Sequence, residues 1–282
     1  MPLDHAHSHL SRATRLYAWV VASLALLLML PFLVGLLADQ SAAFRVSIPS
    51  ALQAPSATEW FGTDPLGRSQ WHRSLLGTTV SLKVVAGSLI LALPVSLFCG
   101  VVAAVFLDRW PDHLISWIIA LLHTVPFFLL VVAAAAIAGP GTTILPWLVG
   151  SVIWAPSARL VRGESIRILR GRFVRTNRAY GASPIRVLSR SVLPLAAPSA
   201  AVSLFYLFPE IIGIDAILTL FGLGPKPPTP SLGGLVFEGI RRWDSAPWLA
   251  GCPCLILIFL CLGMHFLADR IAEQVNLGSR HT

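Results

Sequence analysis

The stretch SLKVVAGSLILALPVSLFCGVVAAVF, from Ser81 to Phe106, decides the fold class of this sequence. It is long and apolar enough to cross a bilayer, because a helix of about 20 apolar residues spans the hydrocarbon core. The whole chain has the same character, since 55% of its 282 residues are hydrophobic and only 12% are charged, whereas soluble domains have about 25% charged residues. The apolar runs lack the period-two alternation of a membrane β-barrel. The sequence therefore predicts an all-α integral membrane protein.

Six apolar runs are expected to form transmembrane helices. They lie approximately at 16–37, 81–106, 114–138, 143–161, 195–221 and 247–268. The fourth is the weakest because it contains Pro146, Gly150 and Pro156, which membrane helices tolerate when neighbouring helices satisfy the freed backbone groups. The first run is longer than the roughly 7 to 15 residues of a signal-peptide core. It is therefore expected to be an uncleaved anchor.

Arginine is concentrated between the fourth and fifth runs. The segment from Arg159 to Arg190 holds nine arginines and a single acid, Glu164, while 40–79 and 222–246 are roughly charge-balanced. Lys and Arg gather in short cytoplasmic loops, so this segment and both termini are expected in the cytoplasm. The net charge of +8 is then mostly one local patch.

Residues 163–194, called the basic loop below, are expected to form two short helices joined by a turn. Two apolar stripes at near-helical spacing mark these helices. They are Ile166, Leu169, Phe173 and Tyr180, then Ile185, Leu188 and Val192. Gly181 suits the left-handed position that ends a helix, and Ser183 and Pro184 suit the N-cap and first position of the next. Pro194 is expected to mark the return into the membrane.

Three kinds of interaction fit a basic two-helix loop. Membrane spans close to both of its ends keep either helix from reaching the major groove of DNA, so no nucleic-acid partner is expected. Contact with the anionic lipid bilayer alone is one alternative. A defined two-helix loop has more structure than topology requires, which favours docking of a cytoplasmic protein.

The spacing of Gly181, eleven residues and then Leu193-Pro194 resembles the EAA loop in inner-membrane permease subunits of ABC importers. Gly181, Leu193 and Pro194 match, and the residues around the glycine, Ala179, Tyr180, Ala182 and Ser183, look like the A-L-G-A-S core common in peptide-type permeases. Arg175, Thr176 and Asn177 stand where that loop usually has Glu, Ala and Ala, and Arg178 completes this entrance.

The resemblance implies that an ATPase subunit binds the basic loop. We expect Arg175 to face an acidic residue in the docking groove of that ATPase, since like charges at an interface are costly. An Arg175 that only faces solvent is the alternative.

A motif before the second run resembles the same group of proteins. Trp60–Arg68 is similar to the G-T-D-x-L-G-R-D motif of dipeptide, oligopeptide and nickel permeases, with Ser69 in place of the last aspartate. Its candidate residues, called the GTD motif below, are Gly62, Thr63, Asp64, Leu66, Gly67 and Arg68. Asp64 is expected to accept backbone amides in an Asx-type turn. The motif is then an ordered turn that seats the second span and forms part of the surface met by a solute-binding protein.

A second outer motif follows the fifth run. Leu220–Ser231 is similar to F-L-G-L-G-x-x-x-P-T-P-S-W-G of the same permeases, with Leu232 in place of the tryptophan. Its candidate residues, called the GLG motif below, are Gly222, Gly224, Pro228 and Pro230. Asp215 lies shortly before it, where an ionised group inside a membrane is costly. We expect Asp215 to be a hydrogen-bonded anchor, to Arg68 or a backbone amide, or else to line the translocation path.

Three motifs in this order imply a permease subunit of a peptide/nickel-type ABC importer, with the type I importer fold and a multi-pass location in the bacterial inner membrane. Residues 1–58 would hold the N-terminal tail, the first helix and the start of the outer loop, and residues 59–282 a transmembrane domain of five helices. The implied partners are a second related permease, expected to form a heterodimer, two cytoplasmic ATPases and an extracytoplasmic solute-binding protein.

No catalytic, cofactor or metal site is expected in this chain. Its only lysines, Lys83 and Lys226, lie in no P-loop context, so ATP and Mg²⁺ are expected to bind the partner subunits. Di- or oligopeptides are the family's usual substrates, and nickel or a metal complex of an opine-like metallophore is the alternative. A secondary transporter or membrane scaffold is the alternative of another class, although no convincing internal repeat supports it. The roles of Cys252, Cys254 and the N-terminal histidines stay open.

Overall fold

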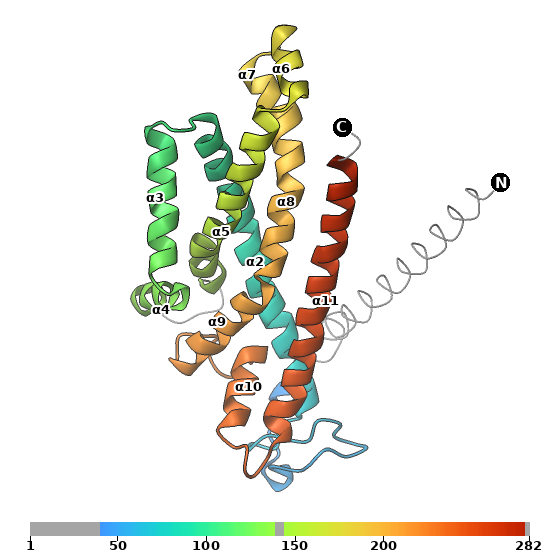
Figure 1. Ribbon diagram of the computed structural model, residues 1–282. Coiled ribbons are helices and arrows are strands. Elements are labelled where there is room, and N and C mark those ends of the chain that lie inside the picture. Colours follow the sequence, from blue (N-terminus) through green and yellow to red (C-terminus); the bar gives the residue numbers. More distant parts are fainter. Residues whose placement is uncertain (1–39, 139–143, 280–282) are drawn as a thin grey trace, which may run out of the picture.

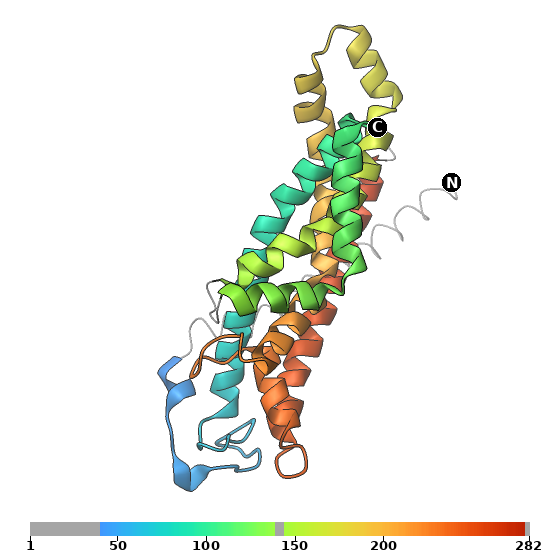
Figure 2. The same ribbon diagram turned by 90° about the vertical axis from the view of Figure 1, so that its left-hand side faces the viewer.

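The computed structural model describes residues 40–138 and 144–279 of the chain (Figure 1). Regular structure in these ranges is helical and includes no β-strand, apart from an isolated bridge between Thr63 and Ser69. The predicted all-α class is confirmed. The helices form an elongated bundle (Figures 1 and 2). The first expected transmembrane run, 16–37, lies outside the described residues.

Eight longer helices make up most of the described bundle. They are α2 (Gln70–Val105), α3 (Trp110–Thr124), α4 (Phe127–Ala138), α5 (Leu145–Leu169), α8 (Leu193–Tyr206), α9 (Phe208–Leu220), α10 (Leu232–Ile240) and α11 (Trp248–Ser279). The shorter elements are η1 (Gln40–Phe44), η2 (Ile48–Ser50), α6 (Arg172–Ala179), α7 (Pro184–Val187) and η3 (Leu188–Val192). Three helices are long and apolar enough to cross a membrane alone, namely Gln70–Val105, Pro184–Tyr206 and Trp248–Glu273, and α3 with α4 would add a fourth span.

The third expected run, 114–138, is not one continuous helix. α3 and α4 are bent by 91° relative to each other. The bend follows from Pro126, whose ring disfavours a helical conformation of the residue before it. Val125 accordingly has extended backbone angles, with φ −87° and ψ 130°. The two helices therefore form a broken span or a re-entrant segment.

The fifth expected run, 195–221, begins earlier and is divided. One helix runs for 23 residues from Pro184 to Tyr206 through α7, the π-helical turn η3 and α8. Pro194, which was expected to mark the return into the membrane, therefore lies inside a continuous helix. Proline lacks an N–H and crowds the carbonyl four residues before it, and the wider turn of η3 accommodates this defect. The chain breaks at Leu207, before α9.

α2 and α5 pack closely along their length because small residues line the contact. A Cβ atom on Gly100 of α2 would lie 2.6 Å from the Cβ of Val161, and one on Gly150 of α5 would lie 2.9 Å from the carbonyl oxygen of Ser88. Small residues let membrane helices approach each other in this way. α5 covers the fourth expected run from Leu145 onward, continues into the basic loop, and is not among the helices apolar enough to span alone.

A buried ion pair ties α3 to α5. Asp112, with its side chain 2% exposed, accepts hydrogen bonds from Nε and Nη2 of Arg162 at 2.6 and 2.7 Å. The direct hydrogen bond to this carboxylate raises the pKa of the Arg162 guanidinium. A bidentate pair of this kind fixes orientation as well as distance. The start of α3 is therefore held against the part of α5 that leads into the basic loop.

We expect Gly100→Ala to destabilise the protein, because the added methyl group must push α5 away from α2. Gly213→Ala in α9 is the matched control, since its Cβ would meet no atom within 4 Å and alanine favours helix over glycine. Thermal unfolding of the purified protein in detergent should show a lower midpoint for Gly100→Ala and an unchanged or higher one for Gly213→Ala. Equal midpoints for the two variants would contradict the packing described here.

A double-mutant cycle should detect the ion pair between Asp112 and Arg162. We expect Arg162→Gln to be the more damaging single change, because it leaves a buried carboxylate without its cation. Directly contacting residues couple by about 0.5 to 3 kcal/mol, so the double variant with Asp112→Asn should be more stable than additivity allows. The measurement is the free energy of unfolding of all four proteins, and strict additivity would argue against the pair.

Candidate functional site

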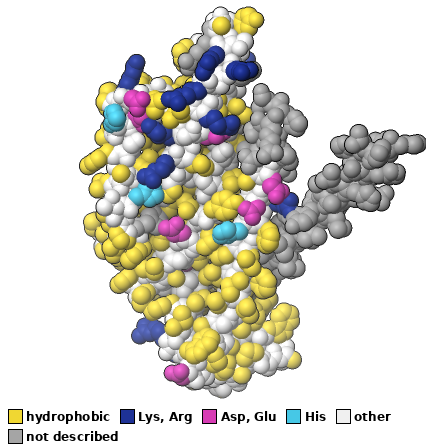
Figure 3. Space-filling model, in the orientation of Figure 1, with side chains coloured by type: hydrophobic (Ala, Val, Ile, Leu, Met, Phe, Trp, Pro, Cys, Tyr) yellow, Lys and Arg dark blue, Asp and Glu magenta, His cyan; other side chains and the backbone are white. Residues whose placement is uncertain are grey.

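The three sequence motifs lie at two opposite ends of the described bundle. The basic loop, with α6 and α7, forms one end, and the GTD motif, the GLG motif and α10 lie toward the other (Figures 1 and 2). Lys and Arg side chains gather toward the basic-loop end, whereas hydrophobic side chains cover much of the remaining visible face (Figure 3). The chain thus carries two candidate sites, one at each end.

Gly181 ends the first helix of the basic loop as predicted. Its φ is +84°, in the left-handed region that glycine adopts without steric cost. The backbone N–H of Ala182 donates to the carbonyl of Asn177 at 3.0 Å, which closes the helix in a Schellman arrangement. α6 therefore stops at Ala179, and the chain turns sharply at the tip of the loop.

Ser183 and Pro184 start the second helix as predicted. The Ser183 side chain accepts a hydrogen bond from the backbone N–H of Arg186 at 3.4 Å, and Pro184 is the first residue of α7. Val187 packs inward from this helix, whereas Ile185 is 78% exposed. Ile185, a member of the predicted apolar stripe, therefore lies on the surface of the loop.

The tip of the basic loop combines exposed apolar and cationic side chains. Tyr180 is 87% exposed, and Arg175 is exposed on α6. A groove of about 320 Å³ lies between α6 and the helix that follows it. It is lined by Asn177, Tyr180, Ala182, Arg186, Val187, Arg190 and Ser191. Exposed aromatic and arginine side chains are typical of protein interfaces.

The other predicted residues of this loop occupy its flanks. Ala179 is exposed at the end of α6, and Leu193 and Pro194 are exposed at the start of α8. The side chain of Arg178 lies outside the described part of the structure. The loop therefore brings the Ala179–Ser183 turn to its tip and leaves Leu193 and Pro194 where the helix descends from it.

The GTD motif is folded around the carboxylate of Asp64, which is 1% exposed. One carboxylate oxygen accepts the backbone N–H groups of Leu66 and Arg68, both at 2.9 Å. The other accepts Nε of Arg68 at 2.6 Å and Nη1 of Arg73 at 2.7 Å. The predicted Asx-type role of Asp64 is confirmed, and Arg73 at the start of α2 is a partner that the motif alone did not indicate.

Glycine and threonine of the GTD motif attach it to the preceding segment. Gly62 and Gly67 have φ values of +67° and +69°, and a Cβ on Gly67 would lie 1.7 Å from the carbonyl oxygen of Ser47. The Thr63 hydroxyl donates to the carbonyl of Ser50 at 2.5 Å and accepts the N–H of Gln53 at 2.8 Å. Leu66 is the exposed member of the motif, at 42%.

Asp215 is buried between α9 and α2. Its carboxylate accepts a hydrogen bond from the Ser81 hydroxyl at 3.3 Å, and the same hydroxyl accepts the backbone N–H of Leu232 at 3.1 Å. The prediction that Arg68 is the hydrogen-bond partner of Asp215 is wrong, because Arg68 pairs with Asp64 instead. Ser81 thus joins α2, α9 and the start of α10.

The GLG motif follows α9 as a tight turn. Gly222 has φ +71°, and a Cβ on Gly224 would lie 2.3 Å from the Thr219 hydroxyl. Both glycines are therefore required by the backbone path. Pro228 and Pro230 lie in the loop that leads to α10, where the Ser231 hydroxyl caps the helix by accepting the N–H of Gly234 at 3.2 Å.

The sequence did not predict the contacts of Arg73 and Ser81 or the pair of Asp112 with Arg162. Each of these residues is polar and lies inside or beside an apolar run, a position where ionised or hydrogen-bonding groups are costly unless they are paired. A polar residue in or beside an apolar run is therefore expected to have a partner, but its position in the sequence does not identify that partner.

The family described as binding-protein-dependent transport system inner membrane component matches residues 96–277. A dipeptide transport system permease protein DppC from Alkalihalophilus pseudofirmus is 30% identical over 241 residues, which cover 84% of this chain and 78% of that protein. A glutathione transport system permease protein GsiD from Pectobacterium atrosepticum is 29% identical, with 79% of this chain and 74% of that protein covered. A dipeptide permease DppC from Lactococcus lactis is 26% identical over 88% of this chain and 72% of that protein.

The matched family region contains the basic loop, the GLG motif, α3 to α10 and most of α11. The alignments to the relatives are longer than this region. The family resemblance of the basic loop and the end-to-end separation of the motifs agree with this match. The chain belongs to the binding-protein-dependent ABC transport permeases, multi-pass subunits of the bacterial inner membrane whose ATP hydrolysis is carried out by separate subunits.

Proposed function

We propose that this chain is one of two related permease subunits that together form the translocation path of an importer for di- or oligopeptides. The relatives named for dipeptide and glutathione transport support this substrate class, since both are small peptides. A solute-binding protein would deliver the peptide on the outer side, and two ATPase subunits would bind on the cytoplasmic side. The second permease is a related chain, so the pair is a heterodimer.

The topology that fits this function has six transmembrane helices and cytoplasmic termini. The end of α11 points toward the side of the bundle that carries the basic loop (Figure 1). If the arginine-rich loop is cytoplasmic, the end of α11 is too. Residues 59–282 then form the transmembrane domain, and residues 1–58 supply the tail, the first helix and the start of the outer loop.

The tip of the basic loop is the proposed docking site for an ATPase. The exposed Tyr180 and Ile185 beside arginines carry this proposal, because an isolated lipid-facing loop does not require a structured groove of about 320 Å³. Ala179, Gly181, Ala182 and Ser183 shape the turn. Leu193 and Pro194 continue it into α8, and Arg175 and Arg178 provide charge on its entrance.

The GTD and GLG motifs belong to the proposed outer face. Their buried hydrogen bonds hold the surface that a solute-binding protein would meet. Asp215 acts there as an internal anchor between helices, because it is 1% exposed in this chain.

We expect Arg175→Glu to weaken binding of the cognate ATPase by about tenfold or more, since like charges at an interface are costly. Changing the facing acid of the ATPase to arginine should restore binding. The measurement is the affinity of the purified ATPase for the reconstituted permease pair. Arg109→Glu is the matched control, because Arg109 is exposed at the same end but lies outside the basic loop. Unchanged assembly and ATPase coupling with Arg175→Glu would refute this docking role.

The substrate class can be tested with the complete importer in proteoliposomes. We expect uptake of a labelled dipeptide to require ATP and the binding protein, and an excess of unlabelled dipeptide to abolish it. Nickel ions should not compete, and nickel should not accumulate. ATP-dependent nickel uptake without dipeptide uptake would replace the peptide proposal with the metal one. If no ATPase subunit co-purifies with the permease, that result would argue against the importer function itself.

A further inference from the structure

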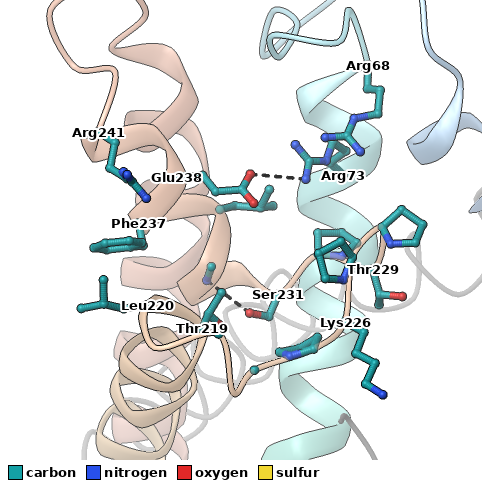
Figure 4. A pocket seen from close by; sticks show the side chains of 18 of the residues that line it. Arg68, Arg73, Thr219, Leu220, Lys226, Thr229, Ser231, Phe237, Glu238 and Arg241 are labelled. Carbon is teal, nitrogen blue, oxygen red and sulfur yellow. Dashed lines mark hydrogen bonds and ion pairs between the residues drawn. The ribbon is translucent and has the colours of Figure 1, made fainter. Parts of the chain in front are cut away.

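An open pocket of about 830 Å³ lies at the end of the bundle opposite the basic loop (Figure 4). Arg68 and Arg73 border it from the α2 side, Glu238 and Arg241 from α10 and its end, and the GLG loop from a third side. The two outer motifs, separated by about 150 residues in the sequence, therefore meet at one cavity. The volume falls within the range of about 300 to 1,000 Å³ that is typical of small-ligand sites.

The pocket has an excess of positive charge. Its lining contains the cationic residues Arg68, Arg73, Lys226, Arg241 and Arg242 and a single carboxylate, that of Glu238. Asp64 pairs with two of these arginines from beneath. Across the described ranges, no ion pair engages Lys226, Arg241 or Arg242. The lining therefore favours an anionic ligand.

Arg73 has one tight and one loose carboxylate partner. Its Nη1 lies 2.7 Å from Asp64, whereas its Nη2 lies 3.4 Å from Glu238, whose side chain is 56% exposed. Nε of Arg73 is buried and has no hydrogen-bond partner in the described structure. Glu238 therefore contacts Arg73 weakly, at the side of the pocket where a ligand carboxylate would meet the guanidinium.

The remaining wall of the pocket is apolar and stiff. It includes Leu220, Leu235 and Phe237, and prolines at 225, 227, 228 and 230. Proline fixes its own φ angle, so this wall is largely formed before a ligand arrives. A ligand that matches both parts of the pocket has a carboxylate for the guanidinium groups, which bind carboxylates in a fork, and a short apolar body.

We propose that this pocket is a binding site for the C-terminal carboxylate end of the transported peptide on the permease itself. The peptide class rests on the function proposed above, and the anionic end rests on the charges of the pocket. In this site, the ligand carboxylate displaces Glu238 from Arg73 and gains Arg241 and Arg242 as further cations. Glu238 acts as an internal competitor that keeps the site weak enough to release the peptide.

The test measures binding of dialanine to the assembled importer in lipid nanodiscs, without the solute-binding protein, by saturation-transfer NMR titration. Dialanine amide, which lacks the carboxylate, is the second probe. We expect saturable binding of dialanine and binding of the amide weakened by about tenfold, since the amide cannot accept charge-assisted hydrogen bonds from the arginines as a carboxylate does. No saturable dialanine binding, or equal binding of the two probes, would overturn the proposal.

Two variants should change the affinity in opposite directions. The double change Arg241→Gln with Arg242→Gln should weaken dialanine binding by about tenfold, whereas Glu238→Gln should strengthen it severalfold by removing the competing carboxylate. Asp244→Asn is the matched control for Glu238→Gln, because it removes an acid near the same end that is absent from the pocket lining. Arg109→Gln at the opposite end is the control for the arginines. A gain with Glu238→Gln cannot come from misfolding.

A parallel measurement separates the peptide from the binding protein as the source of the carboxylate. The affinity of the loaded solute-binding protein for the same nanodiscs is determined for each variant. If Arg241→Gln with Arg242→Gln weakens docking of that protein and leaves dialanine binding unchanged, the pocket receives an acidic side chain of the binding protein and the proposal is wrong. Because uptake and ATPase binding are measured separately, the importer function stands or falls independently of this site.

Discussion

The buried carboxylate of Asp64 is the interaction on which the end of the bundle opposite the basic loop depends. It accepts two backbone N–H groups of its own turn and two guanidinium groups, one of which belongs to α2. Burying a carboxylate is costly unless hydrogen bonds and cations compensate it, as these four contacts do. The same contacts that neutralise it also fix where α2 begins. Since α2 contacts α5, α8, α9 and α10, a shift in its start would displace most of the bundle.

The position of α2 then determines which buried polar side chains can reach their partners on other helices. Ser81 lies three turns beyond the start of that helix and joins Asp215 of α9 to the beginning of α10. Near the other end of α2, Gly100 sets the distance to α5, and α5 carries Arg162 to Asp112. The contacts of Ser81 with Asp215 and of Arg162 with Asp112 each join elements that are distant in the sequence. In an apolar bundle, directional contacts of this type select one arrangement among many of similar packing energy.

The sequence predicts local features of this protein well and connections between helices poorly. Composition and run length indicate an α-helical membrane protein, and turn chemistry predicts Gly181, Ser183 and Asp64 because each depends on a few neighbouring residues. The bend before Pro126 and the continuous helix through Pro194 show the limit. Both involve a proline in an apolar run, and whether the chain breaks there depends on contacts that the run does not encode. Asp215 was recognisable as a residue requiring a partner, but Ser81 lies 134 positions away and follows only from the packing of α2 against α9.

The unbroken helix from Pro184 to Tyr206 gives the basic loop a mechanical reach. At 1.5 Å per residue, its 23 residues extend about 34 Å, so a tilt of about 10° at one end displaces the other by about 6 Å. Its far end is not free to absorb that displacement, because the Tyr206 hydroxyl donates a hydrogen bond to Asp269 of α11. Movement imposed at the loop is therefore delivered to a second long helix and to the break at Leu207. For a given tilt, the displacement at the far end of the helix is therefore set by the length of the helix.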